Sequence, residues 1–533
     1  MYTSKLIFEG LDKTKPIFFD TETLGLYGRT RLVQVRQGKI AYEYDCFFVN
    51  IEDLKFWLKD CHLVIHNAHY DLSCRDFQNW IPAKLDCTLY LSRIQWPELT
   101  SHSLASLSSQ FLSREKTEEG KSDWGEYALT EEQLKYANID TLLVEQLWQK
   151  ISEETKDSPA YKLNVEALLV SLEIQNKGMK TNHKTLLGEK RKYQKEIKRL
   201  TDLLPEGLNV NSPKQVKQYL NVGSSAKGEL YKLNNENCDN ILKLREATKA
   251  LTFIELFNKY DFIYSFTNPS GAKTGRATSK GCELYEDRTN LQQIPKYLKK
   301  GFGVSNGSYY VTADYPALEI RTTCAHYDDD FLYDALKNNK QLHNETCIRM
   351  YGKGKEELSE SQYVAAKSCN FSLLYGAGPK GLYEMFNTRG FRISEEECKE
   401  LVYKWWGIYK GIARKRAEAI QYFQSHSFRI ARTGLGYPIR CNSFTEYLSA
   451  APQGTGAECT KLALVLLKKK CSIIPVNSVH DSIACIARNE KEATEMAQAI
   501  KWAMEESFRR VTRNCLHNDI PCEVETYIGE DYK

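Results

Sequence analysis

Two apolar runs in the second half of the chain end abruptly in a carboxylate. Residues 309–313 are aromatic, β-branched or small, which predicts a strand, and Asp314 follows them before Pro316 ends the strand. Residues 477–483 place apolar positions on both sides of a polar break that contains Asp481, which predicts a hairpin between two strands. An Asp at a strand end is held rigidly and can bind a hard cation, although a cap or turn residue is the ordinary explanation of either one alone.

The first 140 residues alternate like a small sheet with helices around it. Strands are predicted at residues 17–22, 32–35, 47–49 and 63–66. The first strand ends in Asp-x-Glu, and the fourth runs into a helix that carries Asp71. Residues 134–140 show helical periodicity, so Tyr136 and Asp140 share one face four residues apart.

A polar, Pro-containing stretch at 151–165 predicts a domain boundary. Helices are predicted beyond it at 161–178, 183–204 and 457–470, and residues 325–430 are rich in helical periodicity. The 183–204 helix has one apolar face and one basic face, formed by Lys190, Arg191, Lys192, Lys195, Lys198 and Arg199. This basic face is either simply solvated or a sequence-independent contact with phosphates.

The composition of the chain bounds the number of domains and excludes some classes of protein, but it does not indicate a function. At 533 residues the chain is long enough for two to four domains, and its 42% apolar and 27% charged residues are ordinary for a folded protein. The net charge of +4 indicates no particular partner. There is no apolar run long enough to span a bilayer and no apolar signal core at the N-terminus. Sixteen Cys without a Cys-x-x-Cys pair argue against a zinc ribbon and predict reduced, often buried thiols.

The segment between the two strand-end carboxylates supports a functional role for them. Two carboxylates on adjacent strands can hold two Mg²⁺ ions for in-line phosphoryl transfer. Lys367, Phe371 and Tyr375 are spaced by four, which predicts one helical face. A Lys above two aromatic rings can grip a triphosphate while the rings stack on a base. An amphipathic helix that buries both rings would explain the aromatics but not the Lys.

A second acidic set occurs in order in the N-terminal region, and it consists of Asp20, Glu22, Asp71, Tyr136 and Asp140. Two divalent ions need oxygen ligands from several elements, and an attacking water has to be oriented, which a Tyr hydroxyl can do. An Asp-x-Glu pair alone is weak evidence, because such pairs usually cap helices or face solvent.

The segments around Asp314, Lys367 and Asp481 resemble the A, B and C motifs of family A DNA polymerases, the DNA polymerase I-like group. Their order matches, and the first motif, Asp-Tyr-x-x-x-Glu-Ile-Arg, is close. The resemblance implies an α/β and α+β multidomain fold, in which a ribonuclease H-like exonuclease domain at 1–155 precedes a right-hand polymerase domain at 156–533. The expected subdomains are a thumb at about 160–265, a palm at about 266–325 and 431–533, and fingers at about 326–430.

The N-terminal acidic set resembles the three exonuclease motifs of the DEDDy class of 3′–5′ exonucleases. By that resemblance, the four carboxylates are metal ligands, and Tyr136 is the catalytic residue that positions the attacking water. Every position of the pattern is present, so we expect this site to be active.

The resemblance to family A polymerases also implies roles in the second domain. Asp314 and Asp481 are its catalytic residues and metal ligands, with two Mg²⁺ per active site and Mn²⁺ as a substitute. The nucleotide-binding residues are Glu319, Tyr315, His343, Tyr363, Lys367, Phe371 and Tyr375. Glu319 would close the space of a ribose 2′-hydroxyl. The DNA-binding residues are Arg276, which reads minor-groove acceptors near the primer end, together with Thr274, Asn290, Gln293, Gln453 and His480.

Three positions depart from the family pattern. Tyr363 stands one helical turn before Lys367, where most members have an Arg for the triphosphate, and this predicts weaker nucleotide binding unless another cation substitutes. Arg349 is a candidate for that cation. Ser482 stands where Glu is commoner, and Ser449 where Asn is usual.

We therefore expect a template-directed DNA polymerase with a proofreading exonuclease, most like the compact replicases of phages or mobile elements. Its expected partners are primer–template DNA and dNTPs, and beyond them replisome proteins such as a helicase, a primase or a single-strand binding protein. We expect a monomer in the cytoplasm (of the host cell, if phage-encoded) and no membrane association. Two alternatives stay open: a nuclease alone, which Tyr363 favours, and a non-catalytic DNA-binding protein. The intact carboxylates and Lys367 oppose both.

Overall fold

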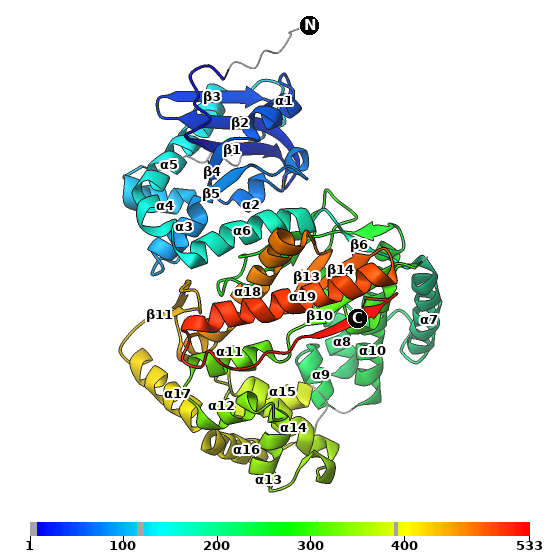
Figure 1. The fold of residues 1–533 in the computed structure, drawn as a ribbon. Helices are drawn as coiled ribbons and strands as arrows, with labels where there is room; N and C mark the ends of the chain where they lie inside the picture. Colours follow the sequence, from blue (N-terminus) through cyan, green and yellow to red (C-terminus); the bar gives the residue numbers. More distant parts are fainter. Residues whose placement is uncertain (1–7, 115–121, 234, 306, 389–392, 533) are drawn as a thin grey trace.

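The computed structural model describes residues 8–114, 122–233, 235–305, 307–388 and 393–532. Figure 1 shows a smaller N-terminal unit above a larger unit, with helix α6 (Pro159–Ile174) between them. All sixteen Cys are free and most are buried, as the sequence predicts. In the described ranges, no helix combines the length and apolar character needed to cross a membrane.

The described part of the N-terminal unit is built on a five-stranded sheet. In sheet order the strands are β3 (Ile40–Asp45), β2 (Arg29–Gln37), β1 (Pro16–Leu24), β4 (His62–Ile65) and β5 (Lys84–Cys87). The central strand β1 is antiparallel to β2 and parallel to β4. Helices surround the sheet: α1 (Ile51–Leu58), α2 (Ala68–Asp71), α3 (Thr88–Gln95), α4 (Leu104–Leu112) and the long α5 (Glu131–Thr155). The short helix predicted after the fourth strand and the helix over 134–140 are therefore confirmed.

The predicted third strand at 47–49 is wrong, because the third strand of the sheet ends at Asp45. The Asp45 carboxylate accepts a hydrogen bond from the N–H of Phe47 (2.9 Å), and its carbonyl accepts one from the N–H of Phe48 (3.0 Å). This turn takes the apolar run out of the sheet and leaves Phe48 63% exposed. The turn chemistry of a single Asp therefore outweighs three apolar residues.

The larger unit is organised around a second sheet, four-stranded and antiparallel within the described residues. Its order is β13 (Asn477–Val479), β14 (Ser482–Ala487), β10 (Tyr309–Asp314) and β15 (Glu525–Gly529). Helices α6, α18 (Phe444–Cys471) and α19 (Glu490–Val511) share an apolar core with one face of this sheet. Because Asp314 pairs with Ser482, the end of β10 lies beside the β13–β14 turn that contains Asp481. The predicted strand and hairpin are confirmed.

Helix α18 is much longer than the helix predicted at 457–470, and it runs straight through Pro452. Pro has no N–H to donate to the carbonyl one turn earlier, which belongs to Leu448. That carbonyl instead accepts a hydrogen bond from the Tyr327 hydroxyl (2.8 Å). A tertiary contact replaces the missing helical bond, and the local sequence gives no sign of it.

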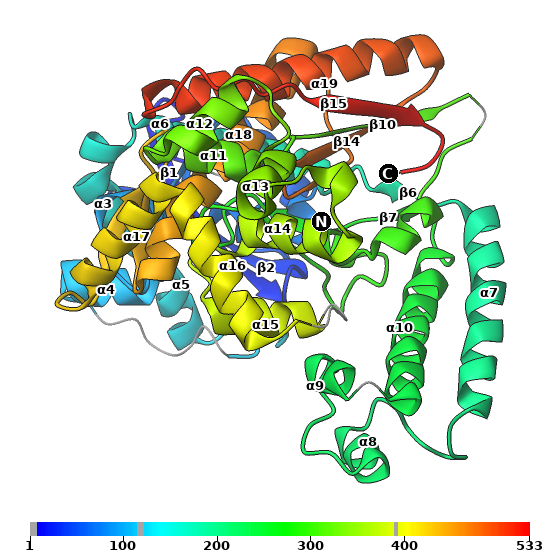
Figure 2. The same ribbon diagram turned by 90° about the horizontal axis from the view of Figure 1, so that it is seen from below.

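Two helical regions flank the second sheet. Figure 2 shows a protruding pair, α7 and α10, with two short helices at its tip; the bounds are α7 (His183–Asp202), α8 (Pro213–Leu220), α9 (Lys227–Lys232) and α10 (Glu236–Phe257). The other region has a core of its own and comprises α11 (Leu318–His326), α12 (Asp330–Lys337), α13 (Leu342–Tyr351), α14 (Glu360–Ser372), α15 (Pro379–Thr388), α16 (Glu395–Ile408) and α17 (Lys410–Phe423). Short strand pairs complete the unit: β6 (Met179–Lys180) with β7 (Phe262–Ile263), β8 (Phe266–Asn268) with β9 (Thr278–Lys280), and β11 (Arg429–Arg432) with β12 (Pro438–Cys441).

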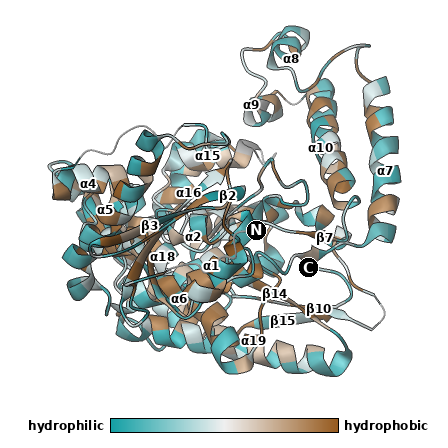
Figure 3. Cartoon of the chain, turned by 90° about the horizontal axis from the view of Figure 1, so that it is seen from above, coloured by the Kyte–Doolittle hydropathy of each residue, from teal (hydrophilic) through white to brown (hydrophobic). Residues whose placement is uncertain are grey.

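The expected thumb starts at about residue 160, whereas the protruding pair starts with α7 at His183. Helix α6 lies outside that pair: Leu163 and Ala167 join the core of the second sheet, while Tyr161 and Leu168 join the core of the N-terminal unit. A helix that is apolar on two sides has to be buried between two bodies. Helix α7, by contrast, is mostly hydrophilic in Figure 3.

Candidate active sites

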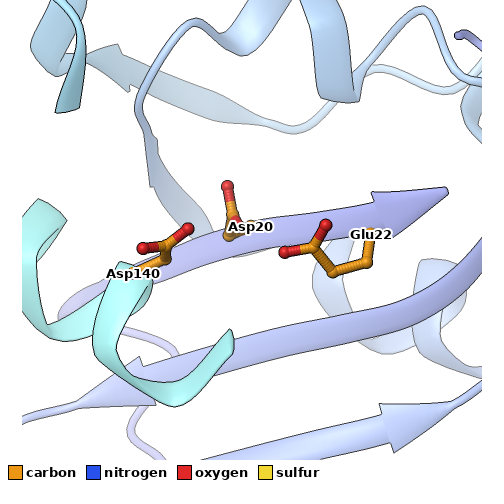
Figure 4. A group of neighbouring side chains, drawn as sticks. All are labelled: Asp20, Glu22 and Asp140. Atoms are coloured by element: carbon orange, nitrogen blue, oxygen red, sulfur yellow. The ribbon is translucent and has the colours of Figure 1, made fainter. Parts of the chain in front are cut away.

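Three carboxylates meet on the central strand of the N-terminal unit. Asp20 and Glu22 stand on β1 and Asp140 on α5, and their carboxylate oxygens lie within 4.8 Å of one another (Figure 4). Alternate residues of a strand point to one side, so Asp-x-Glu directs both of its carboxylates toward the same helix. An all-oxygen donor set of this density fits a hard divalent cation.

Asp71, on α2, is the fourth carboxylate of the predicted set, and it lies beside Thr21 of β1. Its Oδ1 accepts hydrogen bonds from the Thr21 N–H (3.2 Å) and hydroxyl (2.7 Å). Burial, with a smaller contribution from Asp140, raises the pKa of Asp71 to about 7 against the lowering effect of those hydrogen bonds. Tyr136 lies one turn before Asp140 on α5, with its ring buried near that of Trp124. A buried carboxylate that resists ionisation is one that cation binding would stabilise.

The second acidic group lies at the end of β10. Asp314 lies at the strand end, where the residue as a whole is exposed. Partial burial of its carboxyl group, and then the adjacent Asp481 carboxylate, raise its pKa to about 6. The Lys299 ammonium, on the 3₁₀ helix η4 (Lys296–Gly301), opposes that rise. Lys299 lies fifteen residues before Asp314 and outside the motif that contains it, so the motif does not point to it. Two neighbouring carboxylates at a strand end also form a site for a hard cation.

A cavity of about 290 Å³ opens beside this acidic pair, and its lining includes Arg276, Glu319, Phe371, His480 and Asp481. Glu319 and Arg276 form an ion pair across it. Burial and then the nearby Asp481 raise the pKa of Glu319 to about 7. The cavity therefore unites residues expected to contact DNA, sugar and metal.

The helical face predicted for Lys367, Phe371 and Tyr375 is only partly correct. Helix α14 carries the first two, but it ends at Ser372. Gly376 adopts φ +78°, and its N–H bonds back to the Leu373 carbonyl (2.9 Å), which closes the helix. Tyr375 therefore lies in the turn after the helix. Lys367 is exposed, and Phe371 is 39% exposed at the cavity.

His343 is held as a neutral donor close to Phe371, with ring centroids 5.4 Å apart. The Asn370 Oδ1 accepts hydrogen bonds from Trp405 (2.8 Å) and Tyr409 (3.0 Å), so its Nδ2 is the donor to His343 Nδ1 (2.9 Å). The remaining proton of the ring is therefore on Nε2. Burial, and then Lys367, lower the pKa of His343 to about 4.

The ring of Tyr315 does not face the cavity. It is 2% exposed, and its hydroxyl bonds to the Met504 carbonyl (2.9 Å) and the Ser507 hydroxyl (2.6 Å). The side chain therefore belongs to the core beneath the sheet, and not to the nucleotide-binding set expected from the sequence. Its backbone N–H bonds to the Asp481 carbonyl (3.3 Å) and so helps to fix the acidic pair.

The residues expected to bind DNA come from four elements. Thr274 and Arg276 lie in the β8–β9 loop, and Gln453 lies on α18. Asn290 caps the 3₁₀ helix η3 (Leu291–Gln293), which ends in the exposed Gln293. The exposed His480 occupies the β13–β14 turn with φ +55°. Five of the six basic residues predicted on one face of α7 are exposed, and the sixth, Lys190, pairs with Glu255 (3.1 Å).

A cation does lie against Tyr363, but it is not Arg349. The Lys355 ammonium, on the 3₁₀ helix η5 (Lys355–Glu357), stands 5.3 Å from the centre of the Tyr363 ring. The Arg349 guanidinium lies over Phe331 instead (5.9 Å) and interacts with Asp334. Lys355 is therefore a better candidate than Arg349 for the cation that replaces the Arg found at the position of Tyr363 in most family members.

Replacing Tyr363 with Arg should lower KM for dNTPs about tenfold, because a charged, forked donor would replace a neutral hydroxyl. Lys355→Ala should raise KM in the parent and have less effect in the Tyr363→Arg background. Arg349→Ala is the matched control and should show no such coupling. KM and kcat for all combinations form the double-mutant cycles that measure this. Additive effects of Tyr363→Arg and Lys355→Ala would contradict the assignment.

Carboxylates lie together in both units, and donor sets of this kind fit metal-dependent phosphoryl-transfer chemistry. Comparison with family models agrees: residues 171–533 match the family described as DNA polymerase family A, and residues 3–156 match the 3′–5′ exonuclease family. The chain belongs to DNA polymerase family A and carries a 3′–5′ exonuclease domain.

Similar proteins cover the chain to different extents. The DNA polymerase I of Aquifex aeolicus is 26% identical over 99% of this chain and 97% of its own length. The DNA polymerase I of Caldicellulosiruptor bescii is 23% identical over 73% of this chain and 49% of its own length. The DNA polymerase of Bacillus phage SP01 is 24% identical over 51% of this chain and 32% of its own. Among solved structures, the POL domain of Pol1 from M. smegmatis in complex with DNA primer-template and dNTP shares the fold. Its TM-score is 0.77 at 18% identity, over 97% of this chain and 95% of that one.

Proposed function

We propose that the larger unit extends a primer 3′ end with dNTPs along a DNA template, and that the N-terminal unit proofreads by removing 3′ nucleotides. The observation that carries the polymerase assignment is the convergence of Asp314 and Asp481 beside a cavity that Glu319 and Phe371 also line. The M. smegmatis structure is described with primer-template and dNTP, which supports the same ligands here.

Asp314 and Asp481 would hold two Mg²⁺ ions, or Mn²⁺ in their place, which when bound lower the pKa of the primer 3′-hydroxyl and neutralise the leaving pyrophosphate. The exposed Lys367 ammonium meets the triphosphate, and neutral His343 donates from Nε2. Phe371 packs against the sugar and base of the incoming nucleotide. Arg276 leaves Glu319 to reach the minor groove at the primer end, where acceptors occur on every base pair.

In the N-terminal unit, Asp20, Glu22, Asp140 and Asp71 would hold the second pair of ions. Tyr136 orients the water that attacks the terminal phosphodiester. The basic face of α7 contacts phosphates without reading sequence. We further propose a monomeric, cytoplasmic enzyme of phage-type replication that works with a helicase, a primase or a single-strand binding protein.

A labelled primer on a longer template tests the proposal. With Mg²⁺ and dNTPs the primer should lengthen, and with Mg²⁺ alone it should shorten from its 3′ end. Digestion without any extension would favour a nuclease, and binding without either reaction a non-catalytic DNA-binding protein.

Phe371→Tyr should make dideoxynucleotides far better substrates. The resemblance to family A polymerases implies that a Phe at this position goes with rejection of a nucleotide that lacks the 3′-hydroxyl. A Tyr here would go with acceptance, because its hydroxyl can replace the hydrogen bond of the missing 3′-hydroxyl. Termination ladders from the two proteins, at equal ratios of dideoxynucleotide to dNTP, measure the change. Equal ladders would show that this ring does not face the sugar.

A further inference from the structure

The loop between β8 and β9, residues 269–277, makes contacts with both units. Its tip folds back on itself: the Gly275 N–H bonds to the Ala272 carbonyl (2.9 Å), and the Ala272 N–H bonds to the Arg276 carbonyl (3.1 Å). This turn aims Arg276 at the cavity, where it pairs with Glu319. The position of Arg276 therefore depends on what holds the base of the loop.

Ser270, in that base, is 1% exposed and lies in a buried polar cluster. Its hydroxyl donates to Asn164 Oδ1 on α6 (2.6 Å), and the Lys461 ammonium on α18 donates to both the Ser270 hydroxyl and Asn164 Oδ1 (2.7 Å each). Lys461 is itself 5% exposed. A buried ammonium is costly unless its hydrogen bonds are satisfied, so removing any member of this cluster disturbs the rest.

A further contact at Ser270 comes from the exonuclease domain. Arg93, on α3, donates from Nη1 to the Ser270 carbonyl (2.9 Å) and lies within hydrogen-bonding reach of the Tyr437 hydroxyl. The same domain also holds the start of the loop's hairpin, since His69 donates to the Thr267 carbonyl (3.0 Å). A residue of one domain thus fixes the backbone six residues before Arg276 of the other.

We propose that Arg93 is a positioning residue for primer extension: it anchors the Ser270 backbone and thereby holds Arg276 at the primer end. This role rests on the proposed contact of Arg276 with DNA. It makes the exonuclease domain part of the polymerase site, independently of nuclease chemistry. Arg93 touches neither substrate in this arrangement and acts only through the loop.

A double-mutant cycle of Arg93→Ala with Arg276→Ala separates positioning from simple packing between domains. Arg93→Ala should raise KM for primer–template about fivefold, as expected when one charge-assisted hydrogen bond is lost. In the Arg276→Ala background the same change should have less than about a twofold effect, because the residue being positioned is gone. Digestion of single-stranded DNA should be unchanged. Lys150→Ala, which removes an exposed charge from the same domain, is the control and should change none of these.

Additive effects of the two substitutions, or an unchanged KM in Arg93→Ala, would overturn the proposal. If Arg93→Ala lowers the melting temperature, Arg93→Lys replaces it in the cycle, since it keeps the charge and one donor. Its KM should be intermediate, and its effect should again vanish without Arg276; additivity there also overturns the role. If the parent protein does not extend primers at all, the proposed function itself fails. If the parent extends and the effects add, only the role of Arg93 falls.

Discussion

Asp314→Asn or Asp481→Asn should abolish primer extension while leaving digestion of single-stranded DNA intact. The amide has the shape of the carboxylate but neither its charge nor its affinity for a hard cation, so extension should fall by at least about a thousandfold. Conversely, Asp20→Ala with Glu22→Ala should abolish digestion and spare extension. The two acidic groups lie in different units with separate cores, and this separation is the physical reason that the activities should part.

Extension of a labelled primer and digestion of a labelled single strand, each measured on every variant, check this result. Asp60→Asn and Asp202→Asn serve as matched controls, because both residues are exposed and lie outside the two acidic groups. A variant that lost both activities while keeping the parent's melting temperature would contradict the two-site arrangement.

The elements that carry the acidic residues follow directly from local sequence. Tyr309 to Thr312 prefer a strand, and the Asp after them ends it, so the position of Asp314 needs only near neighbours. The same holds for Asp20 and Glu22, whose alternation on β1 fixes a common side. Which strands pair, and hence that Asp314 meets Asp481, came only from the resemblance, because pairing depends on chain segments far apart.

What the sequence missed depends on contacts between distant residues. Helix α18 continues through Pro452 because Tyr327 reaches the carbonyl that the Pro leaves unpaired. Lys355, not Arg349, lies against Tyr363, although Arg349 belongs to the helix that carries His343. By contrast, the sequence contains a local signal for the end of α14 before Tyr375. Gly376 is the kind of glycine that closes a helix at its C-terminal end, so the end of the helix could have been predicted from it. Turn chemistry is thus readable in sequence, whereas tertiary replacement of a hydrogen bond or a charge is not.

The Glu319 side chain can act in two ways, through its bulk in the cavity and through its charge on Arg276. Its side chain lines the cavity together with Phe371, where the bulk of a glutamate would exclude a ribose 2′-hydroxyl. Its carboxylate also pairs with Arg276, which the proposed mechanism releases toward DNA. Shape and charge can therefore be tested apart, because Gln keeps the first and removes the second.

Glu319→Ala should raise the use of ribonucleotides by orders of magnitude relative to deoxynucleotides, because removing a steric block of several kcal/mol changes the ratio of kcat/KM by that much. The ratio of kcat/KM for rGTP and dGTP measures the effect. Glu319→Gln should leave this ratio close to that of the parent, since the wall remains, while the freed Arg276 changes KM for primer–template. If Gln relaxed sugar selection as far as Ala does, charge rather than bulk would exclude the hydroxyl. If neither variant changed the ratio, the sugar of the incoming nucleotide would not lie against Glu319.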